Sequence, residues 1–89
     1  MLVAVYQNRF KRDLKTVIKR GKNVCLLKTI IAKIINEEPL LSKNKEHKLI
    51  GNFKDHWECH IEPDWLLIYK VSNNEAIFIR TGSHSDLFK

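Results

Sequence analysis

The hydrophobic pattern of this chain changes its period once, and that change determines the class of fold. Residues 8–38 carry apolar side chains at the three- and four-residue spacing of helices. From residue 53 onward, apolar side chains recur at every second position, which is the spacing of strands. A short apolar segment at residues 2–6 is typical of a first strand. The expected order is therefore strand, helix, helix and three strands.

The helical part is expected to form two helices joined by a very short turn. Asn8 is a plausible cap for the first helix, and Gly21 is a good stop for its C-terminus. Asn23 is expected to cap the second helix, and Pro39 to end it, because a proline ring cannot continue the hydrogen-bond ladder. The apolar faces are Phe10, Leu14, Val17 and Ile18 in the first helix, and Val24, Leu27, Ile30, Ile31, Ile34 and Ile35 in the second.

The rest of the chain is expected to supply three strands. Residues 40–52 lack periodicity and are expected to form a loop that contains His47. A strand follows from Phe53, with turns at residues 62–64 and 72–75, further strands at 65–71 and 76–81, and a short tail at 82–89. These elements predict an α+β fold. The N-terminal strand and the three later strands form a mainly antiparallel four-stranded sheet, and an antiparallel two-helix hairpin packs on one face of that sheet.

The length of 89 residues predicts one domain covering residues 1–89. No apolar run approaches the length of about 18–20 residues that a membrane span needs, and the N-terminus does not have the order of a secretory signal. Cys25 and Cys59 lie far apart with no local motif, which favours reduced thiols. A cytoplasmic protein without membrane association is therefore expected.

The charge of the chain is unevenly distributed. The net charge is +6, and residues 1–50 hold twelve basic and four acidic side chains. The first helix carries much of this charge, including Lys11, Arg12 and Lys15. A basic first half predicts a polyanionic partner, most simply RNA or DNA, although a solvated lysine-rich helix surface has the same composition.

Several polar side chains are expected to share the open face of the sheet. Alternation places His56, Glu58 and His60 opposite the apolar face that must contact the helices. Arg80 is expected to join this face, Asp64 lies at the turn after His60, and the segments around His47 and His84 come near it. Taken singly, each residue has a plainer explanation: Glu58 and His56 as solvated surface residues, Asp64 as a turn former.

This set of residue types suits RNA cleavage without a metal. A base must take the proton of the ribose 2′-OH, a cation must stabilise the phosphorane-like transition state, and an acid must protonate the 5′-oxygen. Histidine suits both proton roles because its ordinary pKa is about 6.5, and the planar guanidinium of arginine matches phosphate oxygens. A metal site is less well supported, because His47, Cys59, His60 and His84 do not have zinc-motif spacing and Cys59 and His60 point to opposite faces. No cofactor is expected. Phe53, Trp57 and Trp65 are expected to be core or half-buried residues.

The second half of the chain resembles the YafQ-type branch of the RelE/ParE toxin superfamily. The resemblance rests on His47-Lys48-Leu49 with Gly51, on residues 58–69 with their Glu-Pro-Asp-Trp turn, and on the terminal Arg-Thr-Gly-Ser-His block at residues 80–84. The order and spacing of elements also match over nearly the whole chain. Trp57 departs from the pattern, because relatives often carry arginine there.

The resemblance implies the toxin of a bacterial type II toxin–antitoxin pair. Such toxins enter the ribosomal A site and cut mRNA without a metal, leaving a 2′,3′-cyclic phosphate and a 5′-hydroxyl. A cognate antitoxin blocks the toxin, and operator DNA is bound only through their complex. Matched by position, the acid–base residues are His47, His60, Asp64 and His84, Arg80 stabilises charge, and Glu58 and Phe88 contact the substrate nucleotide. His60 with Asp64, assisted by His47, is the expected base, and His84 the expected acid.

Three other functions remain compatible with the residues. The chain could be a nuclease that cuts free RNA, a nucleic-acid-binding module that uses only its basic helix, or a toxin that acts on DNA gyrase through protein contacts. Substitution of His60 and His84 separates the two nuclease hypotheses from the others.

Overall fold

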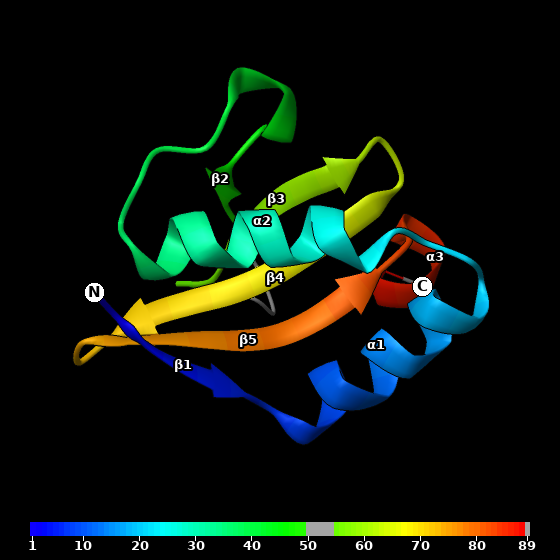
Figure 1. The fold of residues 1–89 in the computed structure, drawn as a ribbon, viewed down its shortest axis with the longest axis horizontal. Helices are drawn as coiled ribbons and strands as arrows, with labels where there is room; N and C mark the ends of the chain where they lie inside the picture. Colours follow the sequence, from blue (N-terminus) through cyan, green and yellow to red (C-terminus); the bar gives the residue numbers. More distant parts are fainter. Residues whose placement is uncertain (50–54, 89) are drawn as a thin grey trace.

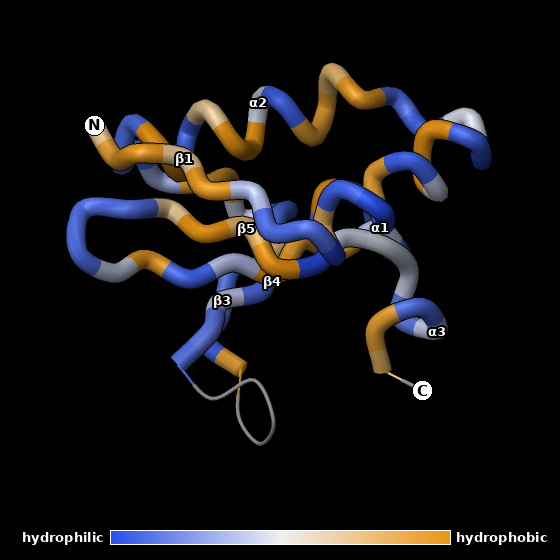
Figure 2. The backbone as a smooth tube through the Cα atoms, turned by 90° about the horizontal axis from the view of Figure 1, so that it is seen from below, coloured by the Kyte–Doolittle hydropathy of each residue, from blue (hydrophilic) through white to orange (hydrophobic). Residues whose placement is uncertain are grey.

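Five strands form one mixed sheet, and two helices cover one of its faces (Figures 1 and 2). The computed structural model describes residues 1–49 and 55–88, so Gly51 and Phe53 lie outside the described residues. The strand order is β1-β5-β4-β3-β2. The elements are β1 (Val3–Tyr6), α1 (Asn8–Lys19), α2 (Val24–Ile35), the 3-10 helix η1 (Ser42–Asn44), β2 (His47–Lys48), β3 (Trp57–Glu62), β4 (Trp65–Ser72), β5 (Glu75–Gly82) and α3 (His84–Leu87). The predicted α+β class and order of elements are confirmed.

The sheet has one more strand than predicted. Residues His47 and Lys48 pair antiparallel with β3, so His47 lies opposite Glu58 at the sheet edge instead of in a loop. A strand of two residues is too short to show an alternating pattern. β3 pairs antiparallel with β2 and with β4, β4 pairs antiparallel with β5, and β1 pairs with β5 in parallel.

The helix ends agree with the sequence only in part. The Asn23 side chain accepts a hydrogen bond from the backbone N–H of Cys25 at 3.0 Å and caps α2 as predicted. Asn8 is not the cap of α1, because it is the first helical residue and Gln7 holds the cap position. Helix α2 ends at Ile35, before Pro39, because Glu37 adopts a left-handed φ of 58° and the N–H groups of residues 37 and 38 bond back to Ile34 and Lys33.

The main core lies between the helices and the sheet. Phe10 and Val17 of α1 share one apolar cluster with the inward face of α2 and with Cys59, Trp65 and Phe78 of the sheet. Trp57 is half-buried at the margin of this cluster and Trp65 is buried within it, as predicted. Both cysteines are unpaired, and burial raises the pKa of the Cys59 thiol to about 12.

A second, smaller apolar cluster occupies the opposite face of the sheet. Leu66 and Ile68 of β4 are fully buried there under Leu87 of α3, with Leu49 and Ile79 beside them. β4 is therefore buried on both faces, which explains its nearly continuous apolar run. The sheet face that was predicted to be open to solvent is partly covered by this cluster, which changes the environment of the polar residues on it. None of the helices formed by the described residues has the length and apolarity to cross a membrane.

Candidate active site

Three histidines and two carboxylates form a continuous group on the face opposite α1 and α2. We call His47, Glu58, His60, Asp64 and His84 the histidine row. Glu58 Oε1 lies 3.3 Å from His47 Nε2 and 3.7 Å from His60 Nε2. The ring centroids of His60 and His84 are 5.7 Å apart, and those of His47 and His60 are 6.5 Å apart. The row contains four of the five predicted acid–base and phosphate-stabilising residues, together with Glu58.

Glu58 is buried, contrary to the interpretation of it as a solvated strand residue. Its side chain is only 7% exposed. The strand register places Glu58 opposite His47 on one side and opposite the buried Ile68 on the other. The two histidines above it and the second apolar cluster beside it remove it from solvent. A carboxylate withdrawn from water and touching two imidazoles is placed to stabilise positive charge on either ring.

Backbone carbonyls fix the orientation of two imidazoles. His47 Nδ1 lies 2.8 Å from the carbonyl oxygen of Lys45, and His60 Nδ1 lies 3.2 Å from that of Pro63. A carbonyl oxygen can only accept, so Nδ1 carries the hydrogen in both rings. The second nitrogen of each ring, Nε2, therefore faces Glu58 and is the atom that can give or take a proton.

The segment before His47 is anchored to the core by a separate contact. The hydroxyl of the buried Tyr69 donates a hydrogen bond to the carboxylate of Glu46. Burial and this carboxylate together raise the pKa of Tyr69 well above its usual value, so the hydroxyl stays a donor. Tyr69 thus fixes Glu46 to the core, and the neighbouring Lys45 carbonyl orients the His47 ring.

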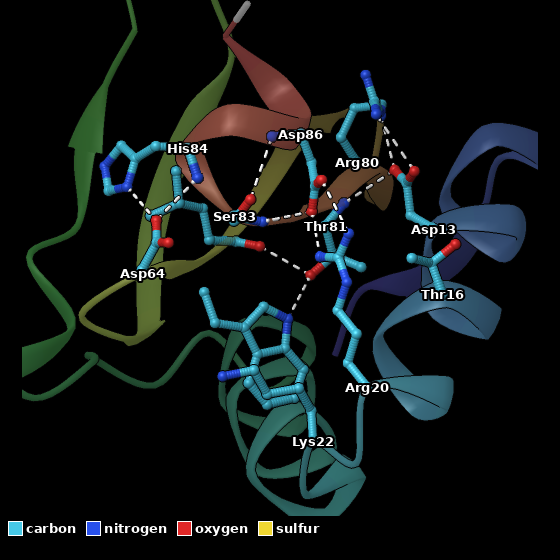
Figure 3. Close-up of polar contacts among 12 residues, drawn as sticks. Asp13, Thr16, Arg20, Lys22, Asp64, Arg80, Thr81, Ser83, His84 and Asp86 are labelled. Carbon is cyan, nitrogen blue, oxygen red and sulfur yellow. Dashed lines mark hydrogen bonds and ion pairs between the residues drawn. The ribbon is translucent and has the colours of Figure 1, made fainter.

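Asp64 orients His84 and not His60, with which the family resemblance paired it. Asp64 Oδ1 accepts hydrogen bonds from the His84 backbone N–H at 2.9 Å and from its Nδ1 at 2.6 Å (Figure 3). These two hydrogen bonds lower the pKa of Asp64, so the carboxylate is ionised at neutral pH. His84 consequently presents Nε2 outward, with a negative charge behind its Nδ1.

A polar network holds the short helix α3 in place. The Ser83 side chain accepts from the backbone N–H of Asp86 at 3.2 Å, and Asp86 Oδ2 accepts from the Ser83 N–H at 2.9 Å, which is a reciprocal helix cap. Arg20, just after α1, donates two hydrogen bonds to Asp86, at 2.6 and 3.1 Å (Figure 3). Arg20 and the Ser83 N–H lower the pKa of Asp86 well below its usual value. A contact across 66 positions therefore fastens the segment that carries His84.

Arg80 lies in β5 and is bound to α1. Its register partner is Ile68, which belongs to the apolar cluster on the row's face of the sheet. Its guanidinium, however, donates from Nε to Asp13 Oδ2 at 2.6 Å and from Nη2 to Oδ1 at 3.2 Å, and Asp13 also accepts from the Thr81 N–H at 3.2 Å. Figure 3 shows Arg80 and His84 on opposite sides of the Ser83–Asp86 turn. Two hydrogen bonds thus hold the guanidinium on Asp13, with Nη1 outside the ion pair.

The remaining predicted residues lie around the row or away from it. Phe88 follows α3 directly and its side chain is exposed. His56 is half-buried, and the row does not include it. Lys11, Arg12 and Lys15 are exposed on α1, which packs against β5, so β4 separates their part of the molecule from β3.

Four residues that support the site were missed by the sequence reasoning. Asp13 and Arg20 act through partners more than sixty positions away, and the sequence contains no signal for such pairs. Asp86 had a local signal, because Ser83 and Asp86 have the spacing of a capping box. The fourth is Asn44, which lies buried in η1 and donates to the His60 carbonyl at 2.8 Å.

Imidazoles and carboxylates are side chains that bind metal ions, so their arrangement in the row decides whether it could be a metal centre. In the described ranges, no group of three or more His, Cys, Asp or Glu side chains is arranged to hold a metal ion. Cys59 lies in the main core on the other face of the sheet, as its alternation with His60 predicts. The arrangement is suited to proton transfer between neighbouring imidazoles and a bound ligand.

Known proteins of similar length resemble this chain in sequence and in fold. The mRNA interferase toxin YafQ of Escherichia coli (strain K12) is 39% identical over 84 residues, covering 93% of this chain and 91% of its own. A metal-bound toxin from Helicobacter pylori has a TM-score of 0.93 at 40% identity, covering 99% of this chain and 100% of its own. YafQ in the E. coli DinJ–YafQ toxin–antitoxin complex has a TM-score of 0.90 at 38% identity, covering 97% and 96%. The family model of the YafQ bacterial toxins of type II toxin–antitoxin systems matches residues 2–89, and this chain belongs to that family.

Proposed function

We propose that this toxin is an endoribonuclease that cleaves mRNA in the ribosomal A site by acid–base catalysis, with residues 1–89 as one catalytic domain. One observation carries the proposal: three imidazoles stand side by side, each with Nδ1 held by an acceptor and two of them with Nε2 beside Glu58. The relatives that carry the name mRNA interferase supply the substrate class. The ribosome requirement follows from the resemblance to the YafQ-type branch.

The base side of the reaction is assigned to His60, with His47 beside it. Nε2 of His60 removes the proton of a ribose 2′-OH, and the oxygen then attacks the neighbouring phosphorus. The imidazolium that forms lies 3.7 Å from Glu58 Oε1, and this carboxylate stabilises its positive charge. His47 faces the same oxygen and relays or shares the proton.

The acid side is assigned to His84. Asp64 stabilises the imidazolium form of His84, whose Nε2–H protonates the departing 5′-oxygen. The P–O5′ bond breaks, and the products carry a 2′,3′-cyclic phosphate and a 5′-hydroxyl. The reacting phosphate therefore lies between His60 and His84, whose ring centroids are 5.7 Å apart.

Two further residues are assigned to the substrate. Arg80 keeps Nη1 outside its ion pair with Asp13, and this nitrogen donates to a phosphate oxygen as negative charge develops. Phe88 follows α3 and is 43% exposed, which suits stacking against a base of the bound nucleotide. The mechanism needs no cofactor.

The proposed setting is the bacterial cytoplasm, where a cognate antitoxin binds and inhibits the toxin. A solved relative is held in a DinJ–YafQ toxin–antitoxin complex, which supports a protein partner of the same kind here. In this proposal the toxin reaches operator DNA only through that complex.

The decisive experiment incubates the protein with a defined mRNA, with and without programmed ribosomes, in buffer containing EDTA, and maps the ends of the products. Cleavage only on ribosomes, ending in a cyclic phosphate, is expected. His60→Ala and His84→Ala should each lower the rate at least about 100-fold, the usual scale for acid–base groups. Circular dichroism of both variants confirms that they fold.

Each other outcome points to a different function. Cleavage of naked RNA would indicate a free ribonuclease. Loss of cleavage in EDTA, restored by a divalent ion, would assign the metal of the Helicobacter pylori relative a role here. Full activity of both histidine variants would rule out the assigned chemistry.

A further inference from the structure

A groove leads away from the histidine row around the edge of the sheet. It consists of two hollows, of about 420 and 120 Å³, that share Leu26, Lys43 and Ile61. The larger hollow begins at His60 and continues past Pro63. The smaller one continues between α2 and η1 as far as Lys33. We call the two together the α2–η1 groove.

A buried asparagine builds the wall of this groove. Asn44 is 3% exposed; its Nδ2 donates to the His60 carbonyl at 2.8 Å, and its Oδ1 accepts from the Leu41 N–H at 3.1 Å. Because β2 pairs only with Trp57 and Glu58, the edge of β3 beyond them is open to this contact. Asn44 thereby fixes η1 against β3, with Lys43 and Lys45 on either side of it.

The side chains that line the groove give it a net positive charge. Lys45, Lys43 and Lys33 line it in order from His60 outward. Among its described lining residues, Glu62 holds the one carboxylate, and Lys22 neutralises it at 2.9 Å. Leu26, Ile61 and Pro63 add apolar surface between the lysines. Cations beside apolar side chains are the chemistry that binds single-stranded nucleic acid, with phosphates on the lysines and sugars or bases on the apolar surface.

We propose that the α2–η1 groove binds the mRNA nucleotides on the 5′ side of the cleaved bond. The inference rests on the proposed function, because His60 is the base and acts on the nucleotide that provides the 2′-OH. The groove starts at His60, whereas His84 lies on the side of the leaving 5′-oxygen. The strand therefore enters along Lys33, Lys43 and Lys45 and reaches the row with its 2′-OH at His60.

The test uses an mRNA that cannot be cut, with a 2′-deoxyribose at the attacking nucleotide, bound to programmed ribosomes. A 4-thiouridine one or two nucleotides 5′ of the cleavage site should photo-crosslink to residues of the groove, as mapped by mass spectrometry. The same probe on the 3′ side should not. A crosslink only from the 3′ side, or only outside the groove, would overturn the proposal.

A variant pair adds a second readout. Lys33→Gln/Lys43→Gln removes two groove charges and leaves Lys45, whose carbonyl orients His47, untouched. The matched control is Lys28→Gln/Lys70→Gln, in which Lys28 lies on the same helix but lines another hollow. Replacing the 5′-flanking phosphates with neutral methylphosphonates should weaken binding of the wild type and of the control about tenfold, and of the groove variant much less. Equal losses in all three proteins would contradict the assignment.

These measurements separate the two proposals. Crosslinking and binding need no cleavage, so they report on the groove even if the histidine row proves inactive. Conversely, the wild type could cleave all-ribose mRNA while the groove gives no crosslink and no difference in binding. That result would support the proposed function and refute this inference.

Discussion

At the residue scale, the chemistry depends on which carboxylate supports which imidazole. Asp64 accepts two hydrogen bonds from His84, and these bonds lower the pKa of Asp64. Its carboxylate therefore stays charged throughout the pH range in which histidines titrate. A constant negative charge behind Nδ1 favours the imidazolium that a general acid requires.

Asp64→Asn tests this support directly. The amide keeps an acceptor for the backbone N–H but removes the negative charge that lies behind Nδ1 of His84. The expected result is a kcat lower by about 10- to 100-fold, with the alkaline limb of the pH–rate profile moved to lower pH. The acidic limb, which reports the base, should stay in place. If the alkaline limb does not move, Asp64 does not support His84 as the general acid.

The residue scale also shows the limit of sequence reasoning for the site. Alternation on β3 correctly predicted that Glu58 and His60 share a face, because side-chain direction in a strand follows position alone. It could not predict that Glu58 is buried, because its burial depends on His47 and Ile68 in neighbouring strands. The partner of Asp64 was likewise decided by the position of α3.

At the scale of elements, α3 is too short to hold His84 by itself. Four residues make barely one turn, and the ion pair from Arg20 and the Ser83 cap supply the missing support. Gly82 leaves no spare room there, since a Cβ on it would come within 2.8 Å of Asp86 Oδ2. Arg20, at the C-terminal end of α1, thus helps to position His84 without belonging to the row.

Arg20→Gln should release this attachment. The kcat of cleavage should fall about tenfold, and the free energy of unfolding at pH 7 should fall slightly, as for other partly exposed ion pairs. Because the folded pKa of Asp86 is depressed, the pair stabilises the protein above the ordinary aspartate pKa of about 3.9 and loses this effect as the pH falls further.

Urea unfolding between pH 2 and 7 measures the effect. Wild type should lose more stability than Arg20→Gln over the acidic part of the range, so the two curves should converge. Parallel curves would show that the ion pair does not stabilise the folded protein.

Elements were predictable where a periodic run was long. Both helices and the three long strands followed from spacing, and the Asn73-Asn74 turn followed from residues that tolerate the φ values of 50° and 66° found there. β2 and α3 were missed because two and four residues carry no period. Their positions depend on tertiary contacts, those of Glu46 with Tyr69 and of Arg20 with Asp86.

At the scale of the whole molecule, two groups of basic side chains lie apart from each other. The α2–η1 groove adjoins the row, whereas Lys11, Arg12 and Lys15 are exposed on α1 beside β5. If the cleaved strand lies along the row and the groove, α1 faces RNA outside the cleaved codon. Ribosomal RNA is then the polyanion that α1 meets, and its attraction should affect association and not chemistry.

Replacing Lys11, Arg12 and Lys15 together by Gln tests this division of charge. Each lost phosphate contact reduces the logarithmic salt slope of association by about 0.7–0.9, so three contacts should reduce it by about 2–3. The kcat at saturating ribosome concentration should not change, and neither should the 5′-side crosslink to the groove. A normal slope would exclude α1 from the ribosome interface. A lower kcat with a normal slope would place the α1 charges at the site of cleavage, because only contacts made in the transition state change the chemical step.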